Sequence, residues 1–314
     1  EDGTPDTNWN TAIANKAFRQ SMYYGLDLTN YWKRTNVIDP MSCENNFYTM
    51  KGLCYTSDGT DYTELVREEM GLPKENGETP IRMDKAKAEE LKKQAMEELT
   101  PLGVTFPVEL DYYIPGSNQA SLDSANVLAQ CFTDAFGEDY IKFNIKTFIK
   151  SNTQEVTIPH LHSILLNGWG ADYGDPMNYL GQERYGEPNA YYSENYSYIN
   201  EITEETPANK ELLAAYKEFN ELVAAADAIN DNMDERYKAF AKAEACLIEN
   251  ALVIPYNYSV GFVLTKIDKD TKINAMFGSC NDKMKNWGTK QSGYTSEEKG
   301  CADKIHAFTE ANKK

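Results

Sequence analysis

One segment decides how the fold and function of this chain are interpreted: Leu165-Leu166-Asn167-Gly168-Trp169-Gly170-Ala171-Asp172-Tyr173-Gly174-Asp175-Pro176. It begins within an apolar run, residues 160–166, which predicts a buried strand. The strand would end in glycines, a tryptophan and two acids. Glycine lets a backbone approach a ligand closely, tryptophan offers a flat apolar wall, and a carboxylate can hold a cation. A strand that ends in this way predicts the rim of a binding crevice.

The bulk composition predicts a globular protein that does not bind nucleic acid. The chain has 314 residues, of which 41% are hydrophobic, and this is enough for one large or two ordinary domains. Its 49 acidic and 31 basic residues give a net charge of -18, whereas nucleic-acid binding relies on Lys and Arg. No apolar run approaches the roughly 20 residues of a membrane span, and the polar N-terminus has no signal pattern. We therefore expect a cytosolic protein, or a mature or trimmed form of an exported one.

The cysteines predict two disulfides and two buried thiols. The six cysteines are Cys43, Cys54, Cys131, Cys246, Cys280 and Cys301. None of their spacings is typical of a zinc site. The first two bracket one polar loop and the last two bracket another, so each pair could close as a disulfide in an oxidising compartment. The remaining two fall within helical patterns and are expected to be buried thiols.

The hydrophobic periodicity predicts helices and strands in alternation. Helices are expected at residues 15–27, 84–99, 121–136, 209–229 and 233–250, with a shorter one at 62–70. Strands are expected at 104–113, 141–149 and 252–264, in addition to 160–166. The order helix, strand, helix, strand predicts an α/β layered domain. Residues beyond about 266 are polar and are expected to be irregular.

No pattern of residues demands an enzyme. His160 and His162 would share one face of the predicted strand, but a metal site needs three or four ligands and no third stands at a suitable spacing. A structural or ligand-contacting role is expected for them instead. The chain has no Gly-x-Gly-x-x-Gly and no P-loop, and Ser296-x-x-Lys299 lies in a polar loop without its partner motifs. We expect no catalytic residues, no metal and no cofactor.

The aromatic content leaves two interpretations open. The chain carries 21 tyrosines, whose apolar faces and polar edges suit adaptable ligand walls. Ordinary half-buried surface accounts equally well for clusters such as Tyr191-Tyr192 and the tyrosines at 196 and 198.

Four segments match a known set of motifs in the same order. They are residues 15–27, residues 84–91, residues 168–176, and residues 235–244 followed by Ile254-Pro255-Tyr256. With these motifs the chain resembles the bacterial extracellular solute-binding proteins of family 5, the oligopeptide- and dipeptide-binding receptors of ABC importers. The resemblance covers about residues 15 to 265.

The resemblance implies a lobe of the periplasmic-binding-protein type II, a layered mixed sheet with helices on both faces. Family members are longer, so residues 1–14 would lead in from a missing N-terminal lobe and 15–265 would form the second ligand-binding lobe. Residues 266–314 would return toward the first lobe. The protein would capture oligopeptides between the lobes and deliver them to an ABC permease in the membrane. It would work at the extracellular face of the cell membrane, lipid-anchored, or in a periplasm.

The resemblance also implies a set of ligand-binding residues: Gly168, Trp169, Gly170, Asp172 and Tyr173. Asp172 matches the acid that pairs with the α-amino group of the peptide. The backbones of Gly168 and Gly170 would hydrogen-bond the peptide main chain as a strand edge does. Trp169 would form part of the wall of a side-chain pocket.

Other positions narrow or question this assignment. Asp175 and Pro176 are expected to form a turn rather than to bind ligand. Leu28 stands where the family usually has Arg, and Leu166 stands where some members carry an Arg that reaches the peptide carboxylate. The alternatives are a lobe for a non-peptide solute such as an oligosaccharide or metal complex, a peptide sensor without transport, and a hydrolase of unrecognised type.

Overall fold

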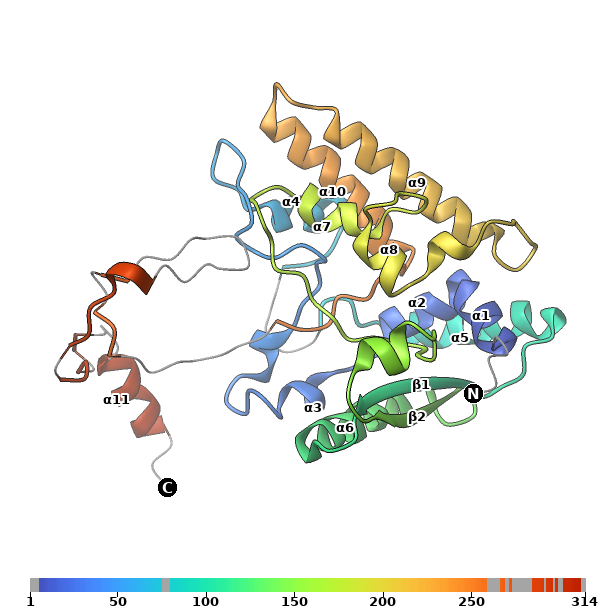
Figure 1. Ribbon diagram of the computed structural model, residues 1–314, viewed down its shortest axis with the longest axis horizontal. Coiled ribbons are helices and arrows are strands. Elements are labelled where there is room, and N and C mark those ends of the chain that lie inside the picture. Colours follow the sequence, from blue (N-terminus) through green and yellow to red (C-terminus); the bar gives the residue numbers. More distant parts are fainter. Residues whose placement is uncertain are drawn as a thin grey trace. The chain divides into compact units, whose positions relative to one another are not determined.

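The structure, a computed structural model, describes residues 6–74, 80–258, 266–268, 271–272, 284–290, 292–295, 297–298 and 302–311. It divides into two compact units. The first comprises Glu1–Trp169 and Gly174–Val260, and the second comprises Gly170–Tyr173 and Gly261–Lys314. Both strands and most helices lie in the first unit (Figure 1).

The elements of the first unit alternate as an α/β chain should. Its helices are α1 (Thr7–Ala14), α2 (Lys16–Gly25), α3 (Thr29–Trp32), α4 (Tyr62–Glu69), α5 (Lys85–Leu99), α6 (Gln119–Phe136), α7 (Met177–Leu180), α8 (Tyr191–Asn195), α9 (Lys210–Asp227) and α10 (Met233–Glu249). Its strands are β1 (Val108–Pro115) and β2 (Ile141–Phe148). Single turns of helix are η1 (Pro40–Cys43), η2 (Thr100–Leu102), η3 (Thr153–Thr157), η4 (Gly181–Glu183) and η5 (Ile199–Glu201). This composition confirms the predicted α/β class.

Side-chain caps begin two of the helices that the sequence predicts. The Asn15 side chain accepts the N–H of Phe18 at 2.8 Å at the start of α2, and Asp84 accepts the N–H of Lys87 at 3.0 Å at the start of α5. Such caps satisfy backbone donors that a helix leaves unpaired at its first turn. The five long helices predicted from the sequence, and the shorter one at α4, are confirmed.

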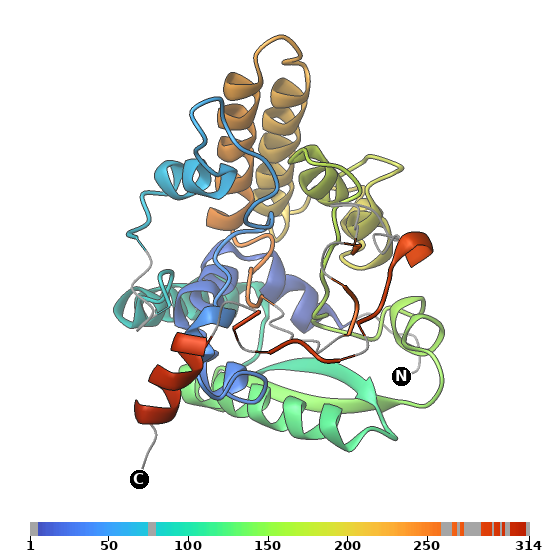
Figure 2. The same cartoon turned by 90° about the vertical axis from the view of Figure 1, so that its left-hand side faces the viewer.

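The sheet of the first unit is a βαβ arrangement. Strands β1 and β2 pair in parallel from Val108 opposite Ile141 to Pro115 opposite Phe148. Parallel neighbours need a long crossover, and α6 supplies it. Figure 2 shows α6 running along one face of these strands. The layered mixed sheet implied by the resemblance is represented among the described residues by these two parallel strands.

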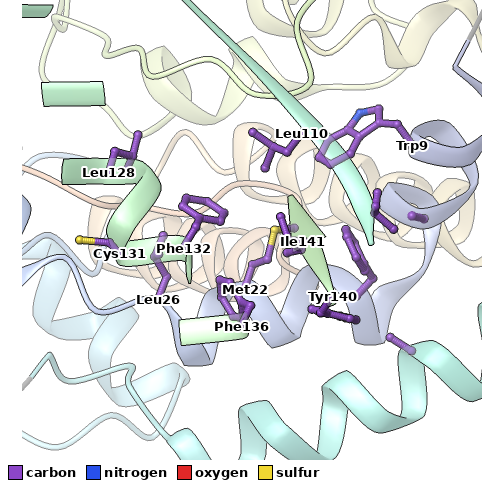
Figure 3. Packing of buried hydrophobic residues seen from close by; sticks show 14 of the residues in the cluster. Trp9, Met22, Leu26, Leu110, Leu128, Cys131, Phe132, Phe136, Tyr140 and Ile141 are labelled. Atoms are coloured by element: carbon purple, nitrogen blue, oxygen red, sulfur yellow. The ribbon is translucent and has the colours of Figure 1, made fainter. Parts of the chain in front are cut away.

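The main hydrophobic core joins this arrangement to the N-terminal helices (Figure 3). Phe132 of α6 packs its ring on Phe136 and on Phe143 of β2, with centroids 5.7 and 5.0 Å apart. Phe18 of α2 packs on Tyr140, which directly precedes β2, at 5.4 Å. Burial of these large apolar side chains supplies most of the driving force for folding.

A second part of the same unit is helical. Helices α9 and α10 form an antiparallel hairpin, and α4 packs on α10 (Figure 1). One apolar stripe of α9 is buried, formed by Leu212, Tyr216, Phe219, Val223 and Ala226. Asp234 and Glu235 lie in the first turn of α10, where they complement the helix dipole.

The predicted strand at 160–166 is wrong. Residues 161–166 are half-buried and irregular, and they form no strand ladder. His160 has a φ of 57°, in the left-handed region, which breaks an extended run. Ser163 donates its N–H to the carbonyl of Asp111 on β1 at 2.9 Å, and its hydroxyl accepts the N–H of Asp111 at 2.8 Å. Because the Ser163 side chain accepts the N–H of Asp111, only one backbone hydrogen bond joins Ser163 to β1.

The predicted strand at 252–264 is also wrong where the structure describes it, over residues 252–258. The backbone there bonds to loops and side chains instead of to a strand. The indole of Trp32 donates to the carbonyl of Tyr256 at 3.0 Å, and Tyr258 donates its N–H to the carbonyl of Cys43 at 2.8 Å. Residues 259–264 lie outside the described residues.

The predicted disulfide between Cys43 and Cys54 is absent, and both are buried free thiols. The two thiols face different neighbours: Cys43 joins the main core, and Cys54 bonds to the hydroxyl of Tyr237 on α10. Burial raises the pKa of Cys54 to about 12, so it stays a thiol. Cys131 and Cys246 are buried free thiols, as predicted. The second predicted pair, Cys280 and Cys301, lies outside the described residues.

The second unit contains α11 (Ala302–Ala311), the turn η6 (Met284–Asn286) and a bridge between Ile267 and Thr289. The irregular structure predicted beyond 266 is therefore wrong for residues 302–311. Of the helices in the described part of the chain, none combines the length and the apolarity that crossing a bilayer requires.

Candidate functional site

The five predicted ligand-binding residues fall on both sides of a boundary between compact units. Gly168 and Trp169 belong to the first unit, whereas Gly170, Asp172 and Tyr173 belong to the second. Asp172 is exposed, and Tyr173 is 50% exposed. The site is therefore described for each unit by itself, beginning with Gly168 and Trp169.

Trp169 is held by two residues of α7. Its indole N–H donates to the Asn178 side-chain oxygen at 2.9 Å, and its carbonyl accepts the hydroxyl of Tyr179 at 3.2 Å. Asn178 and Tyr179 are buried, whereas Trp169 is half-buried. Two bonds from one short helix therefore fix both the backbone and the ring of Trp169.

Gly168 is held from α8 and from its own neighbour. Its carbonyl accepts the hydroxyl of Tyr192 at 2.8 Å, and its N–H donates to the Asn167 side chain at 2.9 Å. A Cβ placed on Gly168 or Gly170 would have no neighbouring atom within 4 Å. Open space thus adjoins both glycines, although the backbone groups of Gly168 already have partners within the chain. Its carbonyl oxygen retains a second lone pair.

Asp175 forms a largely buried, bidentate ion pair with Arg236. Its two carboxylate oxygens accept from Nε and Nη2 of Arg236 at 2.8 and 3.0 Å. It also accepts the N–H of Met177 at 3.0 Å, which agrees with the turn-forming role expected of it. The bidentate bond to Asp175 raises the pKa of Arg236 above its usual value. The sequence predicted the turn and missed the ion pair.

Arg236 also closes the end of α9. Its Nη1 donates to the carbonyls of Ala226, Asp227 and Ile229, and its Nη2 donates to the Asp227 side chain at 2.8 Å. The last carbonyls of a helix have no partner within the helix. One guanidinium therefore joins residue 175 to the turn between α9 and α10.

Two buried acids lie in the helical part, bridged by Tyr48. Glu244 of α10 accepts the N–H groups of Tyr48 and Thr49 at 2.8 and 3.1 Å, and the Thr49 hydroxyl at 2.9 Å. Glu183 of η4 accepts the Tyr48 hydroxyl at 2.8 Å. Burial raises the pKa of both acids, that of Glu183 to about 7.

His160 and His162, the two histidines of the predicted strand, both contact other residues of the chain. His160 stacks its ring on Tyr198, with centroids 3.6 Å apart, and its Nδ1 lies 3.6 Å from the Glu201 carboxylate. The Nε2 of His162 lies 3.1 Å from the carbonyl oxygen of Tyr196, and burial lowers the pKa of His162. Across the part of the chain that the structure describes, no three ligating side chains gather as a metal site would require.

Two cavities of the first unit lie away from Gly168 and Trp169. One, of about 320 Å³, is lined by Asn30 and one face of α6. The other, of about 620 Å³, lies between the end of α5 and the start of α9, with Glu98, Glu205 and Glu211 in its lining. Neither contains a residue of the predicted ligand-binding set.

Comparison with known proteins gives relatives of one kind. The chain is 26% identical over 274 residues to the oligopeptide-binding protein SarA of Streptococcus gordonii, which is 82% of this chain and 40% of that protein. It is 24% identical over 267 residues to the oligopeptide-binding protein AliB of Streptococcus pneumoniae, 78% of this chain and 38% of that protein. No family model matches the chain. The chain thus spans about 40% of the length of these relatives.

Solved structures share its fold. Listeria monocytogenes OppA bound to peptide has a TM-score of 0.58 at 16% identity and covers 90% of this chain and 46% of its own. The substrate-binding domain of an oligopeptide ABC transporter from Bacillus anthracis has a TM-score of 0.56 at 19% identity, covering 82% of this chain and 42% of its own. These likenesses confirm the predicted type II periplasmic-binding-protein fold. The predicted resemblance is confirmed as well, since the relatives are oligopeptide-binding proteins.

Breaking the Asp175–Arg236 ion pair is expected to lower the free energy of unfolding substantially. Arg236→Met would leave the mostly buried Asp175 carboxylate without its cation, so the free energy of unfolding in urea should fall by about 3 kcal/mol. The matched control is Lys238→Met, which breaks the exposed Lys238–Glu235 pair of the same helix, 3.3 Å long. That change should cost under about 1 kcal/mol. Equal losses in the two variants would contradict the role of the buried pair.

Because burial raises the pKa of Glu183, we expect the protein to lose stability as the pH rises. The folded protein holds a proton on Glu183 up to a pKa of about 7, whereas the unfolded chain releases it near the ordinary value of 4.5. The contribution of Glu183 to stability is therefore fully present below about pH 4.5 and is lost as the pH rises through about 7, by up to about 3 kcal/mol.

Glu183→Gln keeps an oxygen to accept the Tyr48 hydroxyl and removes the titration. Urea unfolding at pH 5 and at pH 8 should show a smaller loss of stability with pH in this variant than in the wild type. Glu221→Gln removes an exposed charge on α9 and serves as the control. An unchanged pH profile in Glu183→Gln would contradict the assignment.

Proposed function

We propose that this chain is part of the substrate-binding component of an ABC importer, which captures extracellular oligopeptides and delivers them to a membrane permease. The observation that carries the proposal is the similarity to the oligopeptide-binding protein SarA across 82% of the chain. The solved structures of the same fold include OppA bound to peptide. The structure contributes an aromatic and glycine-containing segment, Gly168 and Trp169, that is fixed by its neighbours and adjoins open space.

In this proposal the first compact unit is the second ligand-binding lobe, residues 15–265, and a further N-terminal lobe completes the clamp. The end of the first unit at Val260 supports a boundary near 265. Trp9 and Ala12 of α1 lie in the core of that unit, so the lead-in residues 1–14 also help to build it. Residues 266–314 return toward the first lobe.

The peptide would be oriented by its α-amino group. Asp172 supplies the carboxylate for that group, and the backbones of Gly168 and Gly170 supply main-chain hydrogen bonds. Trp169 and Tyr173 supply apolar contacts. The exposure of Asp172 supports this assignment, and the net charge of -18 favours the approach of a cationic group.

The protein acts by binding and release and is not an enzyme, which agrees with relatives named as oligopeptide-binding proteins. It works outside the cytoplasmic membrane, lipid-anchored at the cell surface or free in a periplasm. Its partners are the peptide, the permease and the N-terminal lobe, and it needs no cofactor.

Titration calorimetry on the full-length gene product tests the role of Asp172. The ligands are an alanine peptide that carries one phenylalanine and the N-acetylated form of the same peptide. The wild type should prefer the free amine by about tenfold, since acetylation removes one charge-assisted hydrogen bond. Asp172→Asn should abolish the preference, whereas Asp231→Asn, an exposed acid between α9 and α10, should keep it. Equal binding of both peptides by the wild type would contradict the assignment.

A further inference from the structure

The ring of Trp169 is in contact with a second large aromatic ring of the first unit. The ring of Tyr191, the first residue of α8, lies against it with centroids 5.7 Å apart and planes at 47°. Tyr191 is 44% exposed and Trp169 is half-buried. Two large rings from segments about twenty residues apart in sequence therefore meet at the surface. Exposed aromatic rings in contact are suited to a ligand wall, because they add area at little cost in conformational entropy.

The polar atoms of the two rings are already engaged. The indole N–H of Trp169 donates to Asn178, and the hydroxyl of Tyr191 lies 3.2 Å from the hydroxyl of Tyr196. The hydroxyl of Tyr196 also bonds to the side chain of Asn167. A ligand that reaches this pair consequently meets mainly ring carbon, since the indole N–H is taken and the Tyr191 hydroxyl already has one partner.

Two hydrogen bonds from neighbouring residues set the orientation of the ring pair. Asn178 holds the indole, and the hydroxyl of Tyr192 holds the carbonyl of Gly168, one residue before Trp169. Tyr192 also packs its ring edge-on against Trp169 at 5.8 Å and against Tyr191 at 5.8 Å. Tyr192 is buried, so it supports both exposed rings without itself facing solvent.

We infer that Tyr191 is a specificity-determining residue, which together with Trp169 forms one aromatic surface for an apolar or aromatic side chain of the ligand. Asn178 and Tyr192 are positioning residues that fix the orientation of this surface. The inference rests on the proposed peptide-binding function and names the side-chain class that the site selects. A carboxylate is disfavoured there because the faces of aromatic rings carry negative partial charge.

Three synthetic peptides test the selectivity: an alanine peptide, the same peptide with one phenylalanine, and the same peptide with one glutamate. Calorimetry on the full-length gene product should show that the wild type prefers the phenylalanine peptide by about fivefold over the other two. Tyr191→Ala should remove the preference. Tyr191→Phe keeps the ring and should keep the preference. Equal affinities in the wild type, or an undiminished preference in Tyr191→Ala, would overturn the inference.

The positioning role has a readout that needs no ligand. Fluorine NMR of protein labelled with fluorotryptophan identifies the signal of Trp169 as the one lost in Trp169→Phe. Tyr192→Phe and Asn178→Ala should each move that signal and lower the affinity for the phenylalanine peptide by about fivefold. The control Tyr185→Phe removes a similar bond, from a tyrosine hydroxyl to the carbonyl of Ile202 at 2.7 Å, and should change neither quantity.

The two readouts separate the inference from the proposed function. A Trp169 signal that stays in place in both Tyr192→Phe and Asn178→Ala would overturn the positioning role. Absence of binding of every peptide by the wild type, while the Trp169 signal moves as expected, would count against the proposed peptide-binding function and leave the positioning geometry standing.

Discussion

The bidentate pair between Asp175 and Arg236 is the interaction on which the arrangement of this region depends. It joins two stretches about sixty residues apart in sequence, one at the end of the Gly168–Pro176 motif and the other in the first turn of α10. The same guanidinium closes the C-terminal end of α9. Because both charges are largely removed from water, each depends on the other. The pair thereby fixes the start of α7, whose Asn178 holds the indole of Trp169.

Other residues of the four motifs also make buried contacts within the first unit. Arg19, in the first motif, is buried and donates to the carbonyls of Ile13, Ala14 and Asn250. Glu244, in the last motif, is buried and accepts backbone groups of the segment before α4. Because these motif residues are buried and structural, a resemblance based on them is stronger evidence for the fold than for the identity of the ligand. This explains why the type II fold follows from the motifs, whereas the ligand-binding roles assigned near Trp169 remain proposals.

Local patterns predicted the elements that local interactions determine. The helices α2, α5 and α9 were predictable because a few neighbouring residues, such as the caps Asn15 and Asp84, determine them. The strand predicted at 160–166 failed because a long-range contact, the Ser163 hydroxyl on Asp111, replaced a ladder. The bonds that hold Trp169 come from Asn178 and Tyr179, which follow it in the chain but whose roles no spacing indicates. The sequence could therefore suggest the segment 168–176 as a candidate site, but it could not identify the residues whose hydrogen bonds hold that segment in place.

The most direct test of this account is native mass spectrometry of the full-length gene product, purified without denaturation from a lysate rich in peptides. The account predicts bound masses in the range of short peptides, which fragment into amino-acid ladders and are depleted in Asp172→Ala. A protein that carries no such masses, and whose mass shifts only when oligosaccharides or metal complexes are added, would contradict a peptide receptor while leaving the fold unchanged.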